Sequence, residues 1–122
     1  MVFTESLKKN YQFRFVYNKG HSRANRLLVM YVLANGADGN KLGVCVSKKV
    51  GKSVVRSRVS RLIKESYRLN EGKFCKGYDI VVIARASCAG APFAQIESAL
   101  LHLIKKHNVL RMVSTCGAGD KF

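Results

Sequence analysis

The stretch from Lys48 to Arg68, KKVGKSVVRSRVSRLIKESYR, decides how this chain is organised. It contains eight Lys or Arg residues and a single acid, Glu65. At about 100° per residue, its apolar positions gather on one side of a helix. These positions are Val55, Val59, Leu62, Ile63 and Ser66, with Leu69 at the border. The opposite side carries Arg61, Lys64 and Arg68, so the stretch predicts a helix that buries one face and presents fixed cations on the other.

The turn chemistry around this stretch sets its limits. Gly51 and Ser53 interrupt the sequence before the apolar periodicity begins, and Ser53 is a favoured N-cap residue. The periodicity runs to about Asn70, and Gly72 follows it. We therefore expect a helix from about residue 53 to residue 70.

The composition predicts one globular domain with a polyanionic partner. The chain has 122 residues, of which 48% are hydrophobic, and a net charge of +15. So much positive charge repels itself, and nucleic acid is the first candidate for the partner, ahead of an anionic membrane surface. We expect an RNA-binding α+β domain over residues 1–110. Residues 111–122 lack periodicity and are expected to form a flexible tail.

The cysteines and the apolar runs indicate a cytoplasmic protein. Cys45, Cys75, Cys88 and Cys116 form no C-x-x-C pair and no zinc-ligand spacing with the histidines. No secretory signal opens the chain, and the longest apolar run, 27–34, is too short to cross a bilayer. We expect reduced cysteines and no association with a membrane.

The hydrophobic pattern predicts three helices and three strands. Strands are expected at 27–33, 41–47 and 78–85, and helices at 11–18, 53–70 and from Pro92 onward. Residues 1–9 are expected to form an irregular arm, and the loop at 35–40 to close a hairpin. This order predicts an α+β fold, a mixed sheet with helices on one side. Base rates favour a right-handed crossover around the basic helix.

The first predicted helix, capped by Asn10, carries aromatic rings on two faces. Phe13, Val16 and Tyr17 share one face, whereas Tyr11 and Phe15 share the other. A domain of this size cannot bury both faces. Two interpretations remain open: the second face is a partly covered pair of rings, or some of the rings line a groove and stack on bases.

One face of the strand at 41–47 carries only small side chains, Gly43, Cys45 and Ser47. This face allows a close approach to the backbone, either by a packed helix or by a ligand.

The sequence offers little for catalysis by the protein itself. Its seven Asp and Glu residues include no pair at a spacing typical of acid–base chemistry, and its three histidines form no H-E-x-x-H motif. Gly51-Lys-Ser53 resembles the end of a phosphate-binding loop, but Val46 occupies the position that requires glycine. We predict no catalytic residue and no metal site on the protein. The cations favour RNA recognition over a merely solvated face because almost no acids interleave with them.

Residues 47–66, SKKVGKSVVRSRVSRLIKES, resemble the signature of the bacterial ribonuclease P protein subunit, S-K-K-x-G-x-A-V-x-R-N-R. The resemblance extends from about residue 5 to residue 107. It includes LKKNYQFRFVYNKG at 7–20, ANR at 24–26 before the strand that bears Tyr31, and YDIVVIAR at 78–85. Ser57 and Ser60 depart from the family pattern, which has Asn and Lys at these positions.

The resemblance implies an RNA-based function. In this family the protein assists an RNA subunit that removes the 5′ leader from precursor tRNA with bound Mg²⁺, and the protein alone is not expected to cleave. The family also implies a fold like domain 2 of ribosomal protein S5, with a left-handed β-α-β crossover around the basic helix. This expectation replaces the right-handed crossover of the base rates. The expected partners are the RNA subunit and precursor tRNA, with no obligate protein partner.

The resemblance also implies two sets of contact residues. The expected contacts to the RNA subunit are the cations Lys48, Lys49, Lys52, Arg56, Arg58, Arg61, Lys64 and Arg68. The expected leader-binding groove contains Phe13, Tyr17, Arg26 and Tyr31. Two alternatives are a ribosomal-type structural RNA-binding protein with no processing role and a stand-alone nuclease, for which the chain lacks clustered acids.

Overall fold

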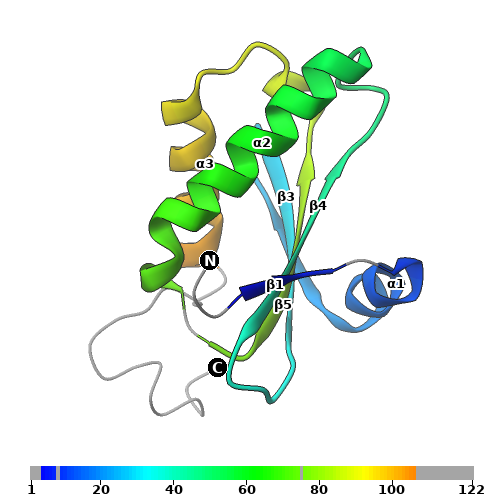
Figure 1. The fold of residues 1–122 in the computed structure, drawn as a ribbon, viewed down its shortest axis with the longest axis vertical. Helices are drawn as coiled ribbons and strands as arrows, with labels where there is room; N and C mark the ends of the chain where they lie inside the picture. Colours follow the sequence, from blue (N-terminus) through cyan, green and yellow to red (C-terminus); the bar gives the residue numbers. More distant parts are fainter. Residues whose placement is uncertain (1–3, 8, 75, 107–122) are drawn as a thin grey trace.

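The computed structural model describes residues 4–7, 9–74 and 76–106 and confirms an α+β fold with a mixed sheet (Figure 1). The elements are β1 (Thr4–Ser6), α1 (Asn10–Lys19), β2 (His21–Ala24), β3 (Leu28–Ala34), β4 (Asn40–Val46), α2 (Ser53–Asn70), η1 (Glu71–Lys73), β5 (Tyr78–Ala84), η2 (Ala86–Cys88) and α3 (Phe93–Lys106). The predicted tail at 111–122 lies outside the described residues.

Five strands form the sheet in the order β1-β4-β5-β3-β2. β4 pairs in parallel with β1 and β5, and β3 pairs antiparallel with β5 and β2. The predicted hairpin at 35–40 is therefore wrong, because β5 lies between β3 and β4. β5 is the strand most suited to the centre, since Ile80, Val81 and Val82 are all fully buried and make both of its faces apolar.

The connection from β4 through α2 to β5 joins neighbouring parallel strands, as a β-α-β unit requires. The left-handed sense of this crossover and the likeness to ribosomal protein S5 stay predictions.

Helices cover both faces of the sheet, so the prediction of helices on one side is wrong. Figure 1 places α2 and α3 on one side and α1 on the other. The strands alternate accordingly: Ile80 and Val82 belong to the large core under α2 and α3, whereas Val81 packs with Leu7 and Val16 under α1. A sheet that is apolar on both faces needs a cover on each.

The two edge strands were not predicted from the sequence. β1 lies within the predicted irregular arm, and β2 lies in a segment with no apolar alternation, His21–Ala24. Both strands are short and mostly exposed, and they are held by backbone pairing rather than by a buried face. Hydrophobic periodicity carries no signal for such strands.

The buried face of α2 agrees with the prediction at Val59, Ile63 and Ser66 and differs near its C-terminal end. Leu69 is 55% exposed, whereas Tyr67 is fully buried. The Tyr67 hydroxyl lies 2.8 Å from Thr4 Oγ1 and 3.1 Å from Asn40 Nδ2, and its ring lies 4.3 Å from that of Phe74. These contacts with three other segments explain why the Tyr67 side chain is buried.

Two predicted N-cap residues are instead the first residues of their helices. α1 begins at Asn10 after Lys9, and α2 begins at Ser53 after Lys52. At α1, the backbone N–H of Lys9 donates to Gln12 Oε1 at 3.1 Å. The helix predicted from Pro92 onward is confirmed as α3, which buries Ile96, Leu100, Leu103 and Ile104.

Candidate nucleic-acid interface

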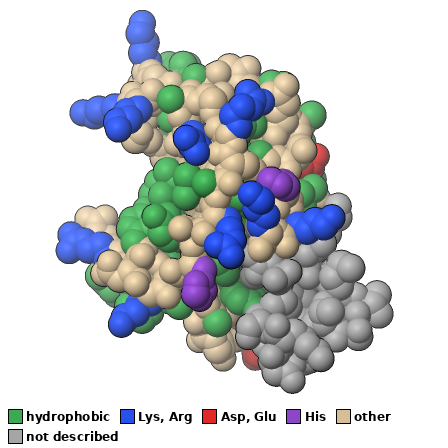
Figure 2. Space-filling view, turned by 180° about the vertical axis from the view of Figure 1, so that it is seen from behind, with side chains coloured by type: hydrophobic (Ala, Val, Ile, Leu, Met, Phe, Trp, Pro, Cys, Tyr) green, Lys and Arg blue, Asp and Glu red, His purple; other side chains and the backbone are tan. Residues whose placement is uncertain are grey.

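The α1 face of the sheet forms a shallow groove with an apolar floor. Half-buried side chains from four elements make up this floor: Phe13, Tyr17, Tyr31, Leu33, Cys45 and Ile83. The register aligns them in rows, with Tyr31 and Gly43 on either side of Val81, and Cys45 beside Ile83. Figure 2 shows hydrophobic side chains in a hollow of this face with Lys and Arg side chains around it. Cys45 and Ile83 were not predicted for the site, although the period-2 alternation of their strands could have placed them.

α1 sits close to the sheet because residue 43 has no side chain. An added Cβ at Gly43 would lie 2.4 Å from Phe13 Cε1 and 3.1 Å from Leu7 Cδ1. The small side chains on this face of β4 allowed a close approach either by a packed helix or by a ligand. In the structure a packed helix, α1, makes this approach. Phe13 thus fixes the position of α1 along one wall of the groove.

Tyr17 and Tyr31 meet in the groove. Their ring centroids are 5.0 Å apart and the rings are inclined at 65°, in the edge-to-face arrangement that aromatic pairs prefer. The Tyr17 hydroxyl lies 3.3 Å from Cys45 Sγ. Burial, together with the contact to Cys45, raises the pKa of Tyr17 above its ordinary value of 10.0, so its hydroxyl is uncharged at neutral pH and stays so in mildly alkaline solution.

The other two rings of α1 point away from this floor. Tyr11 is 67% exposed and Phe15 is 55% exposed. They border a separate hollow of about 560 Å³, together with Arg14, Lys41 and other residues. The sequence-based division of the α1 rings into two faces is therefore confirmed.

The basic helix α2 presents its cations unequally. Arg61 and Lys64 are exposed on the side away from the core. Arg68 is also exposed, but its Nε donates to Glu65 Oε1 at 2.9 Å and its Nη2 pairs with Glu65 Oε2 at 2.5 Å. This pair lowers the pKa of Glu65, chiefly through the hydrogen bond from Arg68, so the only acid of the helix is charged and competes for this guanidinium.

Two arginines of the signature are tied to the fold. Arg56 Nε donates to the Gly51 carbonyl at 3.1 Å, and Arg58 Nη1 donates to the Ala91 carbonyl at 3.2 Å. Both side chains are half-buried. A guanidinium has five N–H donors, so each arginine keeps donors for an anion while one bond fixes its direction.

The three lysines before α2 surround a tight turn. Lys48, Lys49 and Lys52 are exposed, and the Val50 N–H donates to the Ser47 carbonyl at 3.1 Å. Gly51 has φ +152°, which a residue with a side chain rarely adopts. The turn therefore gathers cations next to the helix N-terminus, where backbone N–H groups favour anions.

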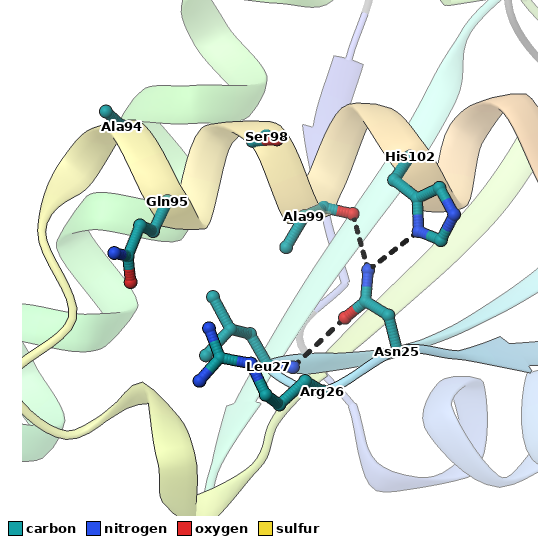
Figure 3. Close-up of a pocket in the computed structure, with 8 residues that line it drawn as sticks. All are labelled: Asn25, Arg26, Leu27, Ala94, Gln95, Ser98, Ala99 and His102. Atoms are coloured by element: carbon teal, nitrogen blue, oxygen red, sulfur yellow. Dashed lines mark hydrogen bonds between the residues drawn. The ribbon is translucent and has the colours of Figure 1, made fainter.

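Arg26 lies apart from the aromatic rings that were predicted to share its site. It follows β2 and lines a hollow of about 410 Å³ with Asn25, Leu27 and α3 residues that include His102 (Figure 3). Asn25 Nδ2 donates to the Ala99 carbonyl at 3.0 Å and lies 3.3 Å from His102 Nδ1. The geometry thus brings Tyr17 and Tyr31 together and places Arg26 at the end of the sheet.

The described residues contain no group of three or more His, Cys, Asp or Glu side chains placed to hold a metal ion. Within the same residues, none of the helices has the length and apolar character to span a membrane. Cys45 and Cys88 are free cysteines in the structure, and burial raises the pKa of the Cys88 thiol.

The family model described as Ribonuclease P matches residues 1–108. This chain belongs to the ribonuclease P protein family. The ribonuclease P protein component of Alkaliphilus metalliredigens is 56% identical over 110 residues, which cover 90% of this chain and 99% of that relative. The counterpart from Lachnoclostridium phytofermentans is 54% identical and covers 88% of this chain and 92% of that relative. The predicted identity as a ribonuclease P protein subunit, part of an endoribonuclease holoenzyme, is confirmed.

Solved ribonuclease P proteins have the same fold. The Staphylococcus aureus protein aligns with a TM-score of 0.80 at 37% identity and covers 87% of this chain and 97% of its own. The Thermotoga maritima protein aligns with a TM-score of 0.77 at 33% identity and covers 84% and 96%. The mixed sheet and its helices are therefore those of the ribonuclease P family.

Proposed function

We propose that this ribonuclease P protein subunit holds two RNA segments on two different surfaces. The groove under α1 receives the 5′ leader of precursor tRNA, and the basic side of α2 with its preceding turn binds the RNA subunit. The observation that carries the proposal is the floor of half-buried rings, Tyr17 against Tyr31, on the sheet face opposite α2.

The groove suits a single strand of varied sequence. Unpaired bases stack on aromatic faces whatever their identity, whereas the apolar floor offers few groups for reading base edges. The uncharged hydroxyl of Tyr17 adds no negative charge beside the phosphates. Phe13, Tyr17 and Tyr31 are assigned to the floor, and Arg26 to the end of the groove at the β2–β3 turn.

The α2 surface suits a folded RNA. Arg61 and Lys64 project into solvent, while Arg56 and Arg58 are directed by bonds to backbone carbonyls. Together with Lys48, Lys49, Lys52 and Arg68 they provide eight cations for phosphate contacts. Fixing the arginines before binding reduces the entropy lost on complex formation.

The net charge of +15 gives the protein an electrostatic role in a metal-dependent reaction. The leader and the RNA subunit are both polyanions, and their repulsion weakens substrate binding unless cations screen it. We infer that Mg²⁺ serves the RNA-based chemistry and that the protein lowers the concentration required.

The test is cleavage of precursor tRNA at low Mg²⁺ by the protein alone, the RNA subunit alone, and both together. We expect cleavage at low Mg²⁺ only with both, and tighter binding of precursor than of mature tRNA. Cleavage by the protein alone would identify a stand-alone nuclease. An unchanged Mg²⁺ requirement and unchanged discrimination between the two tRNAs would instead contradict a role in leader binding.

A further inference from the structure

A second basic surface begins at Arg26, at the end of the groove, and continues across the edge strand β2. It consists of Arg23, Arg26, Arg85, His102 and Lys106, all exposed, and is called the β2–α3 surface here. Figure 2 shows Lys, Arg and His side chains together on the same face as the hydrophobic hollow. These cations belong neither to the signature helix nor to the aromatic floor.

Hydrogen bonds bring the members of this surface to one turn of the chain. Arg85 Nη1 donates to the Asn25 carbonyl at 3.2 Å, and Lys106 Nζ donates to the Ala24 carbonyl at 3.4 Å. The Asn25 side chain in turn contacts His102, as Figure 3 shows. Three segments that are distant in sequence, β2 with its following turn, the residue after β5, and α3, therefore gather their cations around Asn25.

The described segments that form this surface contain no acidic residue. Residues 21–27, 85–88 and 98–106 include no Asp or Glu. The nearest acid along α3 is Glu97, whose Oε2 accepts a bond from Asn70 Nδ2 of α2 at 2.8 Å. An acid-free group of exposed cations attracts a polyanion more strongly than it attracts most proteins.

The groove floor continues to this surface without a barrier. Ser22 pairs with Tyr31 and Ala24 pairs with Val29, so the edge strand contributes only small side chains to the groove side. Arg23 alternates to the opposite side of β2, where α3 lies. A strand lying on Tyr31 can thus pass over the low rim at Ser22 and Ala24 and reach the cations.

Two hollows beside the rim have room for nucleotides. One, of about 410 Å³, lies between the β2–β3 turn and α3, and the other, of about 450 Å³, is lined by Ala24, Arg26, Arg85 and their neighbours. Both include Asn25 and Arg26. Two adjacent small hollows lined by cations suit a flexible chain with a negative charge on each unit. Single-stranded RNA fits this description better than a rigid duplex does.

We propose that the β2–α3 surface binds the phosphodiester backbone of leader nucleotides that lie 5′ of those held in the groove. The proposal rests on the leader-binding role of the groove and extends the bound part of the substrate. Leaders that reach beyond β2 then bind more tightly than leaders that only fill the groove.

The test measures the affinity of the holoenzyme for two precursor tRNAs, one with a leader that fills the groove and one with a longer leader. The variant Arg23→Ala/Lys106→Ala should lose several-fold in affinity for the long leader and nothing for the short one. The slope of log affinity against log salt for the long leader should become shallower by about 1.4, since each single-strand phosphate contact contributes roughly 0.7.

Two further variants serve as controls. Lys9→Ala/Lys41→Ala removes the same charge near the opposite edge of the sheet and should affect the two leaders equally. Arg23→Lys/Lys106→Arg keeps both charges and should preserve the preference for the long leader. Unfolding midpoints of all variants exclude a loss of folded protein as the cause.

Three results would overturn the proposal: equal losses for both leaders, no loss for either, or weaker binding of the RNA subunit. The first would reflect general electrostatics, and the third would assign the surface to the RNA subunit. A failure of the groove itself is distinguishable, because the unaltered protein would then give no preference for the short-leader precursor over mature tRNA.

Discussion

Phe13 lies directly over Gly43, so close that a methyl group on residue 43 would come within 2.4 Å of the ring. The contact joins the helix that walls the groove to the strand that forms its floor. It explains why a strand in the middle of the sheet carries a glycine despite the conformational entropy that glycine loses on folding.

Gly43→Ala should therefore destabilise the protein and disturb the groove. The new methyl group must displace the Phe13 ring or the Leu7 side chain, and overpacking of this kind costs typically about 1–3 kcal/mol. Urea unfolding measures the loss of stability, and binding of precursor tRNA by the holoenzyme measures the disturbed groove. The control is Gly72→Ala, where an added Cβ meets nothing within 4 Å. Equal stability of the two variants would contradict the packing argument.

Tyr31→Ala should weaken binding of the leader without unfolding the domain. Tyr31 is half-buried and its ring is held by Tyr17, and stacking of a base on such a ring is worth roughly 1–3 kcal/mol. The measured quantity is the ratio of holoenzyme affinities for precursor and mature tRNA, which should fall toward one. Tyr11→Ala removes an equivalent ring that is 67% exposed outside the groove and should leave the ratio unchanged. A loss of folded structure in Tyr31→Ala would favour a purely structural ring.

Glu65→Gln should strengthen binding to the RNA subunit. The change removes the only acid between Lys48 and Arg68, and it releases the guanidinium that Glu65 now holds through two hydrogen bonds. The salt dependence should become steeper as Arg68 gains a phosphate contact, by roughly 0.9 in slope on duplex RNA if B-DNA serves as the guide. Titration of the RNA subunit at several salt concentrations measures both effects. Weaker binding would indicate instead that Glu65 orients Arg68 toward the RNA.

The sequence predicted well those elements that have a periodic apolar face. The buried residues of α3 follow directly from spacing, since a helix with one buried face has apolar side chains at fixed intervals. The strand β5 follows from its continuous apolar run, which a strand buried on both faces requires. β1 and β2 were not predicted, because edge strands of three and four residues are held by backbone hydrogen bonds. Such pairing requires no apolar pattern in the side chains. The order of the strands was not predicted either. A loop such as 35–40 is compatible with a hairpin of β3 and β4 and also with the insertion of β5 between them.

For the candidate site, the sequence allowed a prediction of those residues whose type alone determines their chemistry. Cations of α2 and rings of α1 could be named from the sequence, but their directions could not. Arg58 turns back to the Ala91 carbonyl, 33 residues further along the chain, and no local pattern encodes that bond. The same holds for Tyr67, which lies outside the predicted apolar stripe and is buried where its hydroxyl oxygen accepts a hydrogen bond from Asn40 and contacts Thr4, both distant in sequence.

Tyr67→Phe should lower stability by about 1–2 kcal/mol at pH 8, because the variant loses the contacts of the buried hydroxyl with Thr4 and Asn40. Burial is the main cause that raises the pKa of Tyr67 above its ordinary value of 10.0. A raised pKa in the folded state means that stability from the protonated hydroxyl is fully present below pH 10 and is lost as the pH rises through the folded-state pKa. The difference in unfolding free energy between the unaltered protein and the variant should therefore shrink above pH 10. Urea unfolding at pH 8 and at two pH values above 10 measures it. Tyr11→Phe, at an exposed ring, should match the unaltered protein at pH 8, and a difference for Tyr67→Phe that stays constant with pH would contradict the linkage.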